Sequence, residues 1–226
     1  MKKKIGVVVA IEIDSVLKKY GEPKKKDVVA GCDILAYETE DYELFVIHSG
    51  AGEINAAAGT QILISLYGVE KIINFGVVGA LTADMTTTEL CVVEKVVHYD
   101  FDARDWLGIP KGQYPDNNSV FFETDKELLN KATEIAPELK KVVCASADKF
   151  VASPEAKSAL NKEFGADICE MESAGIVITC AKNKIPCLLI KAISDSLLGG
   201  DKEFLKELGR VSEICFDVAD KVIKSI

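Results

Sequence analysis

Two short stretches of the chain place carboxylic acids beside apolar segments. Cys169-Glu170-Met171-Glu172-Ser173 puts two glutamates directly before a run that is typical of a helix, from Ser173 to Asn183. Ala192-Ile193-Ser194-Asp195 puts an aspartate at the end of Cys187–Ile193, an almost wholly apolar run typical of a buried strand. Removing a carboxylate from water is costly, so acids in such places usually either have partners or take part in catalysis.

A structural interpretation of the same acids is also open. Asp195 would then be the N-cap of a following helix, and Glu170 and Glu172 would be solvated residues where another helix starts. Caps of this kind are common, so the spacing alone is compatible with both interpretations. The rest of the chain bears on the choice.

Composition narrows the class of protein. A chain of 226 residues with a formal net charge of −9 has the size of one domain, and it lacks the clustered Lys and Arg that bind a phosphate backbone. We therefore predict a single domain over residues 1–226 and no nucleic-acid partner. The seven cysteines are odd in number and form no CxxC pair, which favours free buried thiols. With two histidines and no recognisable ligand spacing, we predict neither a metal nor a cofactor.

The first residues, Met1–Lys4 followed by an apolar run from Ile5 to Ile11, superficially resemble a signal peptide. The run is short, Glu12 ends it, and no small-x-small cleavage pattern follows, so we interpret it as a first core strand. No stretch approaches the roughly 20 apolar residues of a membrane-spanning helix. We predict a cytoplasmic protein without a membrane partner. The basic run Lys24–Lys26 is expected to be a solvated turn.

The hydrophobic pattern predicts alternating strands and helices. Apolar segments typical of buried strands occur at 5–10, 71–75, 89–97, 141–146 and 187–193. Segments expected to be helical are 12–20, 53–66, 125–135, 154–164, 173–183 and 201–225. Segments 33–39 and 42–48 predict an antiparallel hairpin, and 98–119 a long irregular loop. This order predicts an α/β fold, a three-layer α/β/α sandwich around a mixed, mostly parallel twisted sheet.

Several predicted strands end in residues able to contact a ligand, and ligands bind at the carboxyl edge of open α/β sheets. Glycines there allow the backbone to approach a flat ligand closely, and an aromatic side chain offers a stacking face. Several acids around an apolar slot suit cleavage of a glycosidic bond, because one acid protonates the leaving group while another activates water. The residues concerned are Glu12, Gly76–Gly79, Phe150, Val151, Glu170, Glu172, Ser194 and Asp195.

The turn Ser49-Gly50-Ala51-Gly52 lies between a predicted strand and a predicted helix, as in dinucleotide-binding motifs. The third glycine position is Asn55, however, and no clear ribose-binding acid follows a second strand. We favour a tight strand-to-helix turn, whose backbone N–H groups can still face a ligand.

The order and spacing of these motifs resemble a known family. Together they are similar to the nucleoside phosphorylase and nucleosidase superfamily, nearest to the 5'-methylthioadenosine/S-adenosylhomocysteine nucleosidases. The resemblance implies hydrolysis of the N-glycosidic bond of a small purine nucleoside, releasing adenine and a 5-thio-substituted ribose. It rests on seven segments spread over nearly the whole chain: Ala10–Asp14, Ser49–Gly52, Asn74–Leu81, Gly112–Pro115, Asp148–Val151, Glu170–Ser173 and Ala192–Asp195.

The resemblance also implies a role for the motif residues. Glu12 would activate the attacking water, Asp195 would protonate the purine at N7, and Glu172 would bind the ribose hydroxyls. Asp195 must carry a proton when it acts, and we expect the apolar strand behind it to favour the protonated form. The other implied contacts are Met171 and Gly79 beside the sugar, Phe150 stacked on the base, the backbone of Val151 at the edge of the base, and Val77 and Ser194 lining the same site.

Two residues near the expected position of the attacking water differ from the family pattern. Nucleosidases of this type commonly have Ser where Val77 stands and Arg where Lys191 stands. Lys191 would supply a point charge in place of a planar fork. Alternatively, it is a lysine with a buried stem and a solvated head.

The resemblance further implies a homodimer in which loop 101–115 contacts the neighbouring site. Phosphorolysis is an alternative reaction, but phosphorylases of this superfamily hold phosphate with arginines near the first strand, and the first arginine of this chain is Arg104. An acid at Glu12 would repel phosphate, so water is the expected nucleophile. The alternatives are a phosphate-dependent purine nucleoside phosphorylase, a hydrolase of a related nucleoside such as futalosine, and a non-catalytic binding module.

Overall fold

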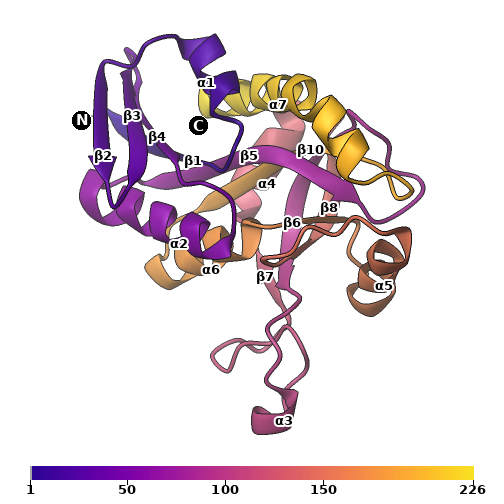
Figure 1. Cartoon of the computed structure of the whole chain (residues 1–226). Helices are drawn as coiled ribbons and strands as arrows, with labels where there is room; N and C mark the ends of the chain where they lie inside the picture. The colour runs from indigo at the N-terminus through magenta and orange to yellow at the C-terminus, as the bar shows by residue number, and fades with distance from the viewer. Residues whose placement is uncertain (1) are drawn as a thin grey trace.

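The computed structural model describes residues 2–226, so Met1, the first residue of the predicted domain, lies outside it. Strands and helices alternate around a ten-stranded sheet (Figure 1). The strands are β1 (Lys3–Val9), β2 (Lys25–Val29), β3 (Cys32–Glu38), β4 (Tyr42–His48), β5 (Lys71–Ala80), β6 (Leu90–His98), β7 (Phe121–Glu123), β8 (Lys140–Ser146), β9 (Ile168–Glu170) and β10 (Cys187–Asp195). The helices are α1 (Ile13–Tyr20), α2 (Glu53–Ile62), the π-helix η1 (Leu63–Tyr67), α3 (Arg104–Leu107), α4 (Lys126–Ile135), α5 (Pro154–Phe164), α6 (Ser173–Asn183) and α7 (Asp201–Ile223).

The sheet is mixed, as predicted, but parallel pairings are not in the majority. Five pairings are parallel, namely β1–β4, β1–β5, β5–β10, β6–β8 and β8–β9. Five are antiparallel, namely β2–β3, β3–β4, β6–β10, β5–β9 and β6–β7. Hairpins and short strands at the margins account for most of the antiparallel pairings, whereas β4, β1, β5 and β10 run parallel through the centre. The parallel strands bring their carboxyl ends to one edge, where ligands bind in such sheets.

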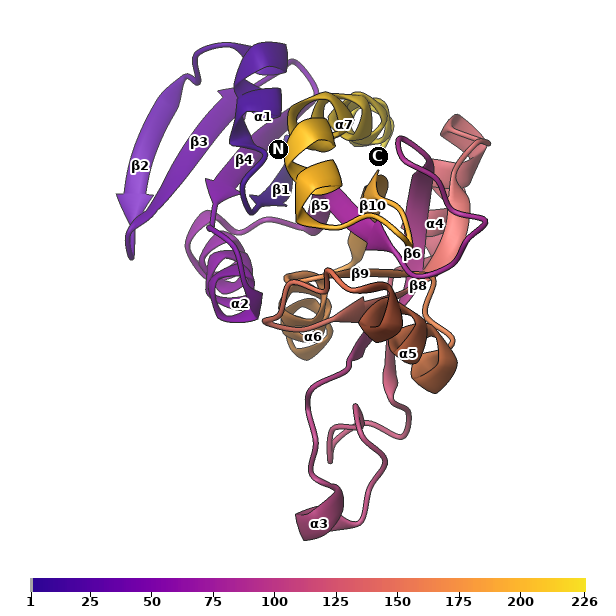
Figure 2. The same cartoon turned by 45° about the vertical axis from the view of Figure 1, so that its right-hand side comes forward.

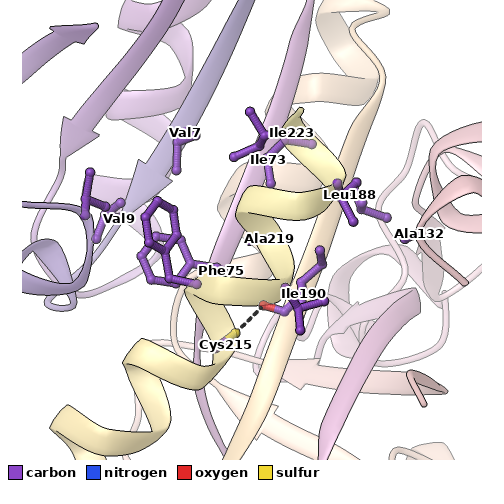
Figure 3. Close-up of a cluster of buried hydrophobic side chains, with 14 of the residues drawn as sticks. Val7, Val9, Ile73, Phe75, Ala132, Leu188, Ile190, Cys215, Ala219 and Ile223 are labelled. Carbon is purple, nitrogen blue, oxygen red and sulfur yellow. Dashed lines mark hydrogen bonds between the residues drawn. The ribbon is translucent and has the colours of Figure 1, made fainter. Parts of the chain in front are cut away.

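Helices cover both faces of the sheet because successive strand residues point to opposite sides. Val7 and Val9 of β1 pack with α7 and α4 on one face, while Val8 packs with α2 and α6 on the other. On the first face the rings of Phe75 and Phe216 lie 4.5 Å apart. Figure 3 shows α7 lying across the strands, with the Cys215 thiol donating to the Ile190 carbonyl at 3.3 Å. The strands that carry the site are therefore held from both sides.

Several local predictions can be compared with the structure. The hairpin is confirmed as β3 and β4, which pair antiparallel. All seven cysteines are free thiols, as predicted, and six are buried. The expectation of a turn at Lys24–Lys26 is wrong, because Lys25–Val29 forms the edge strand β2. Lysines are common on edge strands, since their charge discourages pairing with another chain.

Residues 100–119 form an arm that extends from the sheet and carries α3 at its tip (Figures 1 and 2). Stacked rings fix the base of the arm, with Phe101 and Tyr114 4.1 Å apart. The Nδ1 atom of His98 lies 2.8 Å from the Tyr114 hydroxyl. At the tip, Trp106 is 83% exposed. Within residues 2–226, no helix has the length and apolar character needed to cross a bilayer.

Candidate functional site

One cavity at the carboxyl edge of the central strands brings together all nine predicted site residues. Its volume is about 190 Å³, and its walls come from the ends of β1, β5, β9 and β10 and from the segment between β8 and α5. The nine residues are Glu12, Val77, Gly79, Phe150, Val151, Met171, Glu172, Ser194 and Asp195. The convergence follows from the sheet, since β1, β5 and β10 are adjacent and parallel. The individual roles stay predictions.

Backbone groups hold Glu12 at one end of the cavity. Its Oε1 accepts the Val77 N–H at 3.1 Å, and its Oε2 accepts the N–H of Ile11 at 3.1 Å. The carboxylate also lies against Gly76, where a Cβ atom would come within 2.8 Å of Oε1. Glycine is therefore required for this close approach, because real Cβ contacts are longer. Glu12 is 7% exposed.

Asp195 forms a buried ion pair that the sequence did not predict. Its Oδ2 accepts Lys157 Nζ at 2.5 Å, and its Oδ1 accepts the Ser194 hydroxyl at 2.9 Å. Lys157 is fully buried, and its ammonium also donates to the carbonyls of Ser196 at 2.6 Å and Gly199 at 3.1 Å. These acceptors use all three ammonium protons. The ammonium thus joins α5 to the acid and to the loop that follows β10.

The ion pair corrects two expectations about Asp195. The surroundings of the acid are not simply apolar, because a lysine from α5 balances its charge. Nor is Asp195 a helix cap, since the N-cap of α7 is Gly200. One sequence signal was available, because Lys157 lies three residues before Leu160 and seven before Phe164, on the inward stripe of α5.

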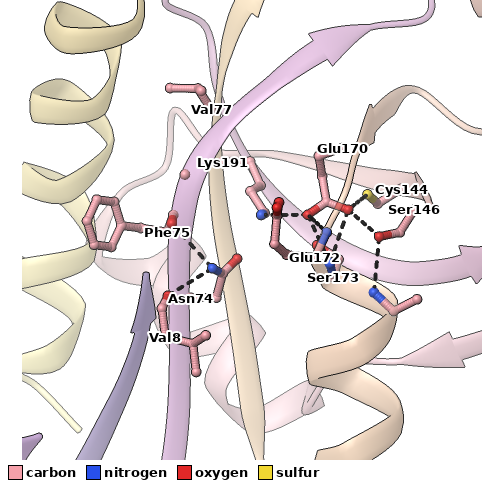
Figure 4. Close-up of polar contacts among 12 residues, drawn as sticks. Val8, Asn74, Phe75, Val77, Cys144, Ser146, Glu170, Glu172, Ser173 and Lys191 are labelled. Carbon is pink, nitrogen blue, oxygen red and sulfur yellow. Dashed lines mark hydrogen bonds and ion pairs between the residues drawn. The ribbon is translucent and has the colours of Figure 1, made fainter. Parts of the chain in front are cut away.

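A second buried ion pair lies beneath the cavity (Figure 4). Lys191 Nζ donates to Glu170 Oε2 at 3.1 Å, and both side chains are almost fully buried. Burial opposes ionisation of Glu170, but the Lys191 ammonium and the Ser146 hydroxyl hold the pKa of this carboxyl below its ordinary value. Burial by itself lowers the pKa of Lys191, yet the Glu170 carboxylate raises it above its ordinary value. Neither alternative interpretation, a solvated head for Lys191 or a solvated helix start for Glu170, is found.

Side chains from other elements cap the N-terminus of α6. The Ser173 N–H donates to Glu170 at 2.9 Å, the Ala174 N–H donates to Ser146 Oγ at 3.1 Å, and the Gly175 N–H donates to Glu53 Oε2. These first N–H groups of the helix would otherwise lack partners. Glu53 and Ser146 were not predicted as site residues.

Because these other side chains cap α6, the Glu172 side chain is free to face the cavity. Glu172 occupies the N-cap position of α6, but its carboxylate turns away and accepts the Gly52 N–H at 2.8 Å. Gly52 therefore donates to a side chain of the protein, which supports the tight-turn interpretation of Ser49–Gly52. Burial, reinforced by the nearby Glu170 carboxylate, raises the pKa of Glu172 to about 7.

The opposite wall is apolar. Phe150 is 44% exposed and meets Phe204 of α7 edge to face, with ring centroids 5.3 Å apart. Val151 and Met171 complete a slot that suits a flat ring. Asp195 lies beside Gly79, whose Cβ position would be 3.0 Å from Oδ2.

Glu12 and Asp195 therefore contact β5 three residues apart, at Gly76 and Gly79. Three residues of a strand span about 10 Å. A ligand of nucleoside size can lie between two acids so placed, with one acid at each end. The arrangement can protonate a leaving group at one end and activate water at the other.

Comparisons with known proteins agree on one family. The family model described as "Phosphorylase superfamily" matches residues 4–224. The chain is 31% identical over 232 residues to the aminodeoxyfutalosine nucleosidase of Helicobacter pylori, covering 100% of this chain and 98% of that protein. It is 31% identical over 199 residues to the 5'-methylthioadenosine/S-adenosylhomocysteine nucleosidase of Glaesserella parasuis, covering 85% of each. The crystal structure of the Helicobacter pylori 5'-methylthioadenosine/S-adenosylhomocysteine nucleosidase with butyl-thio-DADMe-Immucillin-A has a TM-score of 0.95 and 29% identity over 100% of both chains.

The Lys191–Glu170 pair generates a stability prediction. Replacing Lys191 by Met leaves Glu170 buried without its counter-ion, so we expect the free energy of unfolding to fall by about 3–5 kcal/mol. Urea denaturation followed by circular dichroism measures this loss. The control is Lys206→Met, at a lysine whose side chain is 79% exposed, which should change stability by no more than about 0.5 kcal/mol. Equal stabilities for the two variants would contradict the importance of the pair.

Proposed function

The chain belongs to the phosphorylase superfamily, and from this premise we propose that it hydrolyses the N-glycosidic bond of 5'-methylthioadenosine and S-adenosylhomocysteine. The products are adenine and a 5-thio-substituted ribose. The observation that carries the proposal is that Glu12, Glu172 and Asp195 line one cavity together with an apolar slot, and that Glu12 and Asp195 contact β5 three residues apart. We also propose that residues 1–226 act as one domain.

Asp195 is the proposed general acid. As negative charge builds on the departing purine, Asp195 transfers its proton to N7 and is left as a carboxylate, which the Lys157 ammonium stabilises. A positioned acid of this kind contributes about 10²–10⁴-fold to the rate. Phe150 stacks on the base, and the backbone of Val151 binds its edge.

Ser194 supports either protonation state of the acid. Its single hydroxyl proton faces both Asp195 Oδ1 at 2.9 Å and the Val78 carbonyl at 3.1 Å. The hydroxyl donates to Asp195 when that acid is ionised. When Asp195 is protonated, the hydroxyl can turn its proton to the Val78 carbonyl, which leaves the proton of the acid free for transfer to N7.

Glu12 is the proposed general base for water, and Glu172 binds the ribose hydroxyls beside Met171 and Gly79. The charges around the proposed position of the attacking water, beside Glu12, favour hydrolysis over phosphorolysis. Glu12 accepts backbone N–H groups and is paired with no cation among the described residues, and the ammonium of Lys191 is already paired with Glu170. A phosphate dianion would be repelled from such a site.

We further propose a cytoplasmic homodimer in which loop 101–115 covers the site of the neighbouring subunit. The exposed apolar side chains at the tip of the arm support this arrangement, since Trp106 is 83% and Leu107 37% exposed. Apolar groups presented together on a projecting segment are typical of protein interfaces.

The acid–base assignment predicts the effect of two isosteric variants. Asp195→Asn and Glu12→Gln remove the transferable proton and the base but preserve shape, so we expect kcat to fall by about 10²–10⁴-fold for each. Isothermal titration calorimetry with the substrate should show that binding is largely retained. Asp217→Asn and Glu213→Gln are matched controls, since both acids are substantially exposed on α7. Wild-type kcat in either site variant would remove that residue from its assigned role.

A second candidate function is hydrolysis of aminodeoxyfutalosine, favoured by the relative of that name that matches the whole chain. The apolar lining residues Ile11, Met171 and Phe204 favour the first candidate, because they suit the thioether that its two substrates share. We therefore expect a higher kcat/KM for adenine release from 5'-methylthioadenosine than from aminodeoxyfutalosine. A spectrophotometric assay with both nucleosides decides, and the opposite ranking would favour the second candidate.

A further inference from the structure

Glu53, the first residue of α2, is a buried acid that the proposed reaction does not use. It is 6% exposed and lies where α2 packs against α6. Its Oε1 contacts the Ser146 hydroxyl, and its Oε2 accepts the Gly175 N–H. A buried acid needs a reason to be retained, because burial of its charge is costly.

The hydrogen bonds of Ser146 indicate a proton on one of two neighbouring carboxyl groups. The Ser146 hydroxyl accepts the Ala174 N–H at 3.1 Å and contacts both Glu53 Oε1 and Glu170 Oε1, the latter at 2.5 Å. A hydroxyl has one proton to donate and two lone pairs to accept with. It can therefore donate to one of the two carboxyl groups, and the other carboxyl group must donate to it.

The donors around the two carboxyl groups favour Glu53 as the protonated one. Glu170 accepts from the Lys191 ammonium and from the backbone N–H groups of Glu172 and Ser173, which together stabilise its ionised form. Glu53 has one backbone donor, from Gly175. The side chains around the Glu53 carboxyl group are mostly acidic or neutral, and the nearby cation is Lys191. The ionisable groups facing this region are Glu170, Glu172, Lys191, Asp148, Cys144, Tyr99 and Tyr114.

We propose that Glu53 is a neutral carboxylic acid at neutral pH and acts as a positioning residue for the sugar-binding end of the site. It donates to Ser146, which donates to Glu170, so that the Glu170–Lys191 pair and the capped start of α6 hold Glu172 at the cavity. The positioning role rests on the proposed function, whereas the protonation state of Glu53 does not.

The proposal has a defined pH dependence. Burial, together with the Glu170 carboxylate, raises the pKa of Glu53 to about 8, from an ordinary value of 4.5. The folded chain therefore binds a proton that the unfolded chain has lost, in the window from about pH 4.5 to 8. Stability from this source is complete below pH 4.5 and declines as the pH rises through the window. Above it, two carboxylates face the single Ser146 hydroxyl proton, and the hydrogen bond between Glu53 and Ser146 is lost.

Glu53→Gln tests the proposal because a glutamine amide mimics the protonated acid. Its NH₂ group donates to Ser146, and its carbonyl accepts from Gly175. We expect wild-type kcat/KM at neutral pH, and loss of the step near pH 8 that ionisation of Glu53 should add to the alkaline decline of wild type. Glu127→Gln makes the same change at an exposed position in the first turn of α4 and should leave the wild-type decline in place.

Infrared spectroscopy and thermal unfolding test the protonation state independently of activity. We expect the carbonyl-stretch region of wild type at neutral pH to contain a component from protonated Glu53, and Glu53→Gln to lose this component while those of the other buried acids stay. The melting temperature of wild type should fall more steeply than that of Glu53→Gln between about pH 4.5 and 8. A wild-type spectrum without this component, a variant that fails to fold, or a variant with strongly reduced kcat/KM at neutral pH would each overturn the proposal. An inactive wild type that retains the component would instead count against the proposed function alone.

Discussion

The site depends on how buried negative charge is balanced at one edge of the sheet. Among residues 2–226, Glu12, Glu53, Glu170 and Asp195 are buried there, together with the ammonium groups of Lys157 and Lys191. An unpaired buried charge costs several kcal/mol, so each acid needs its own solution. The carboxylates of Asp195 and Glu170 each form an ion pair with a lysine. The Glu12 carboxylate accepts two backbone N–H groups, and Glu53 is protonated.

The topology of the sheet makes these solutions possible. Because β1, β5 and β10 are parallel neighbours, Glu12, the glycines of β5 and Asp195 reach the same edge although they are far apart in sequence. The lysines come from different layers, Lys191 from within β10 and Lys157 from α5. Side chains from other elements cap α6, so the residue at its N-cap position, Glu172, does not have to. The Glu172 carboxylate can therefore face the cavity. Packing and function are therefore linked through the start of α6.

Much of this arrangement was predictable from the sequence, for physical reasons. Apolar runs identified the central strands, and a proline after Ser153 predicted α5 with the bounds that the structure shows. The rule that ligands bind at the carboxyl edge identified eight of the nine site residues around the cavity, and the family resemblance added Met171. The balance of parallel and antiparallel pairings was not predictable, because a strand's pattern records its burial and not the direction of its neighbour. Lys157, Ser146 and Glu53 were missed for a related reason. Their partners lie 38, 24 and 93 residues away, and such contacts appear only once the chain is folded.

The most direct test of the proposed chemistry follows the oxygen atom that attacks the sugar. The measurement is adenine release from 5'-methylthioadenosine in water enriched in heavy oxygen, with and without inorganic phosphate, with mass spectrometry of the sugar product. We predict equal rates in both buffers and incorporation of heavy oxygen at C1 of the 5-thio-substituted ribose. Adenine release only with phosphate, accompanied by a sugar 1-phosphate, would contradict hydrolysis and the role of Glu12 as the base for water.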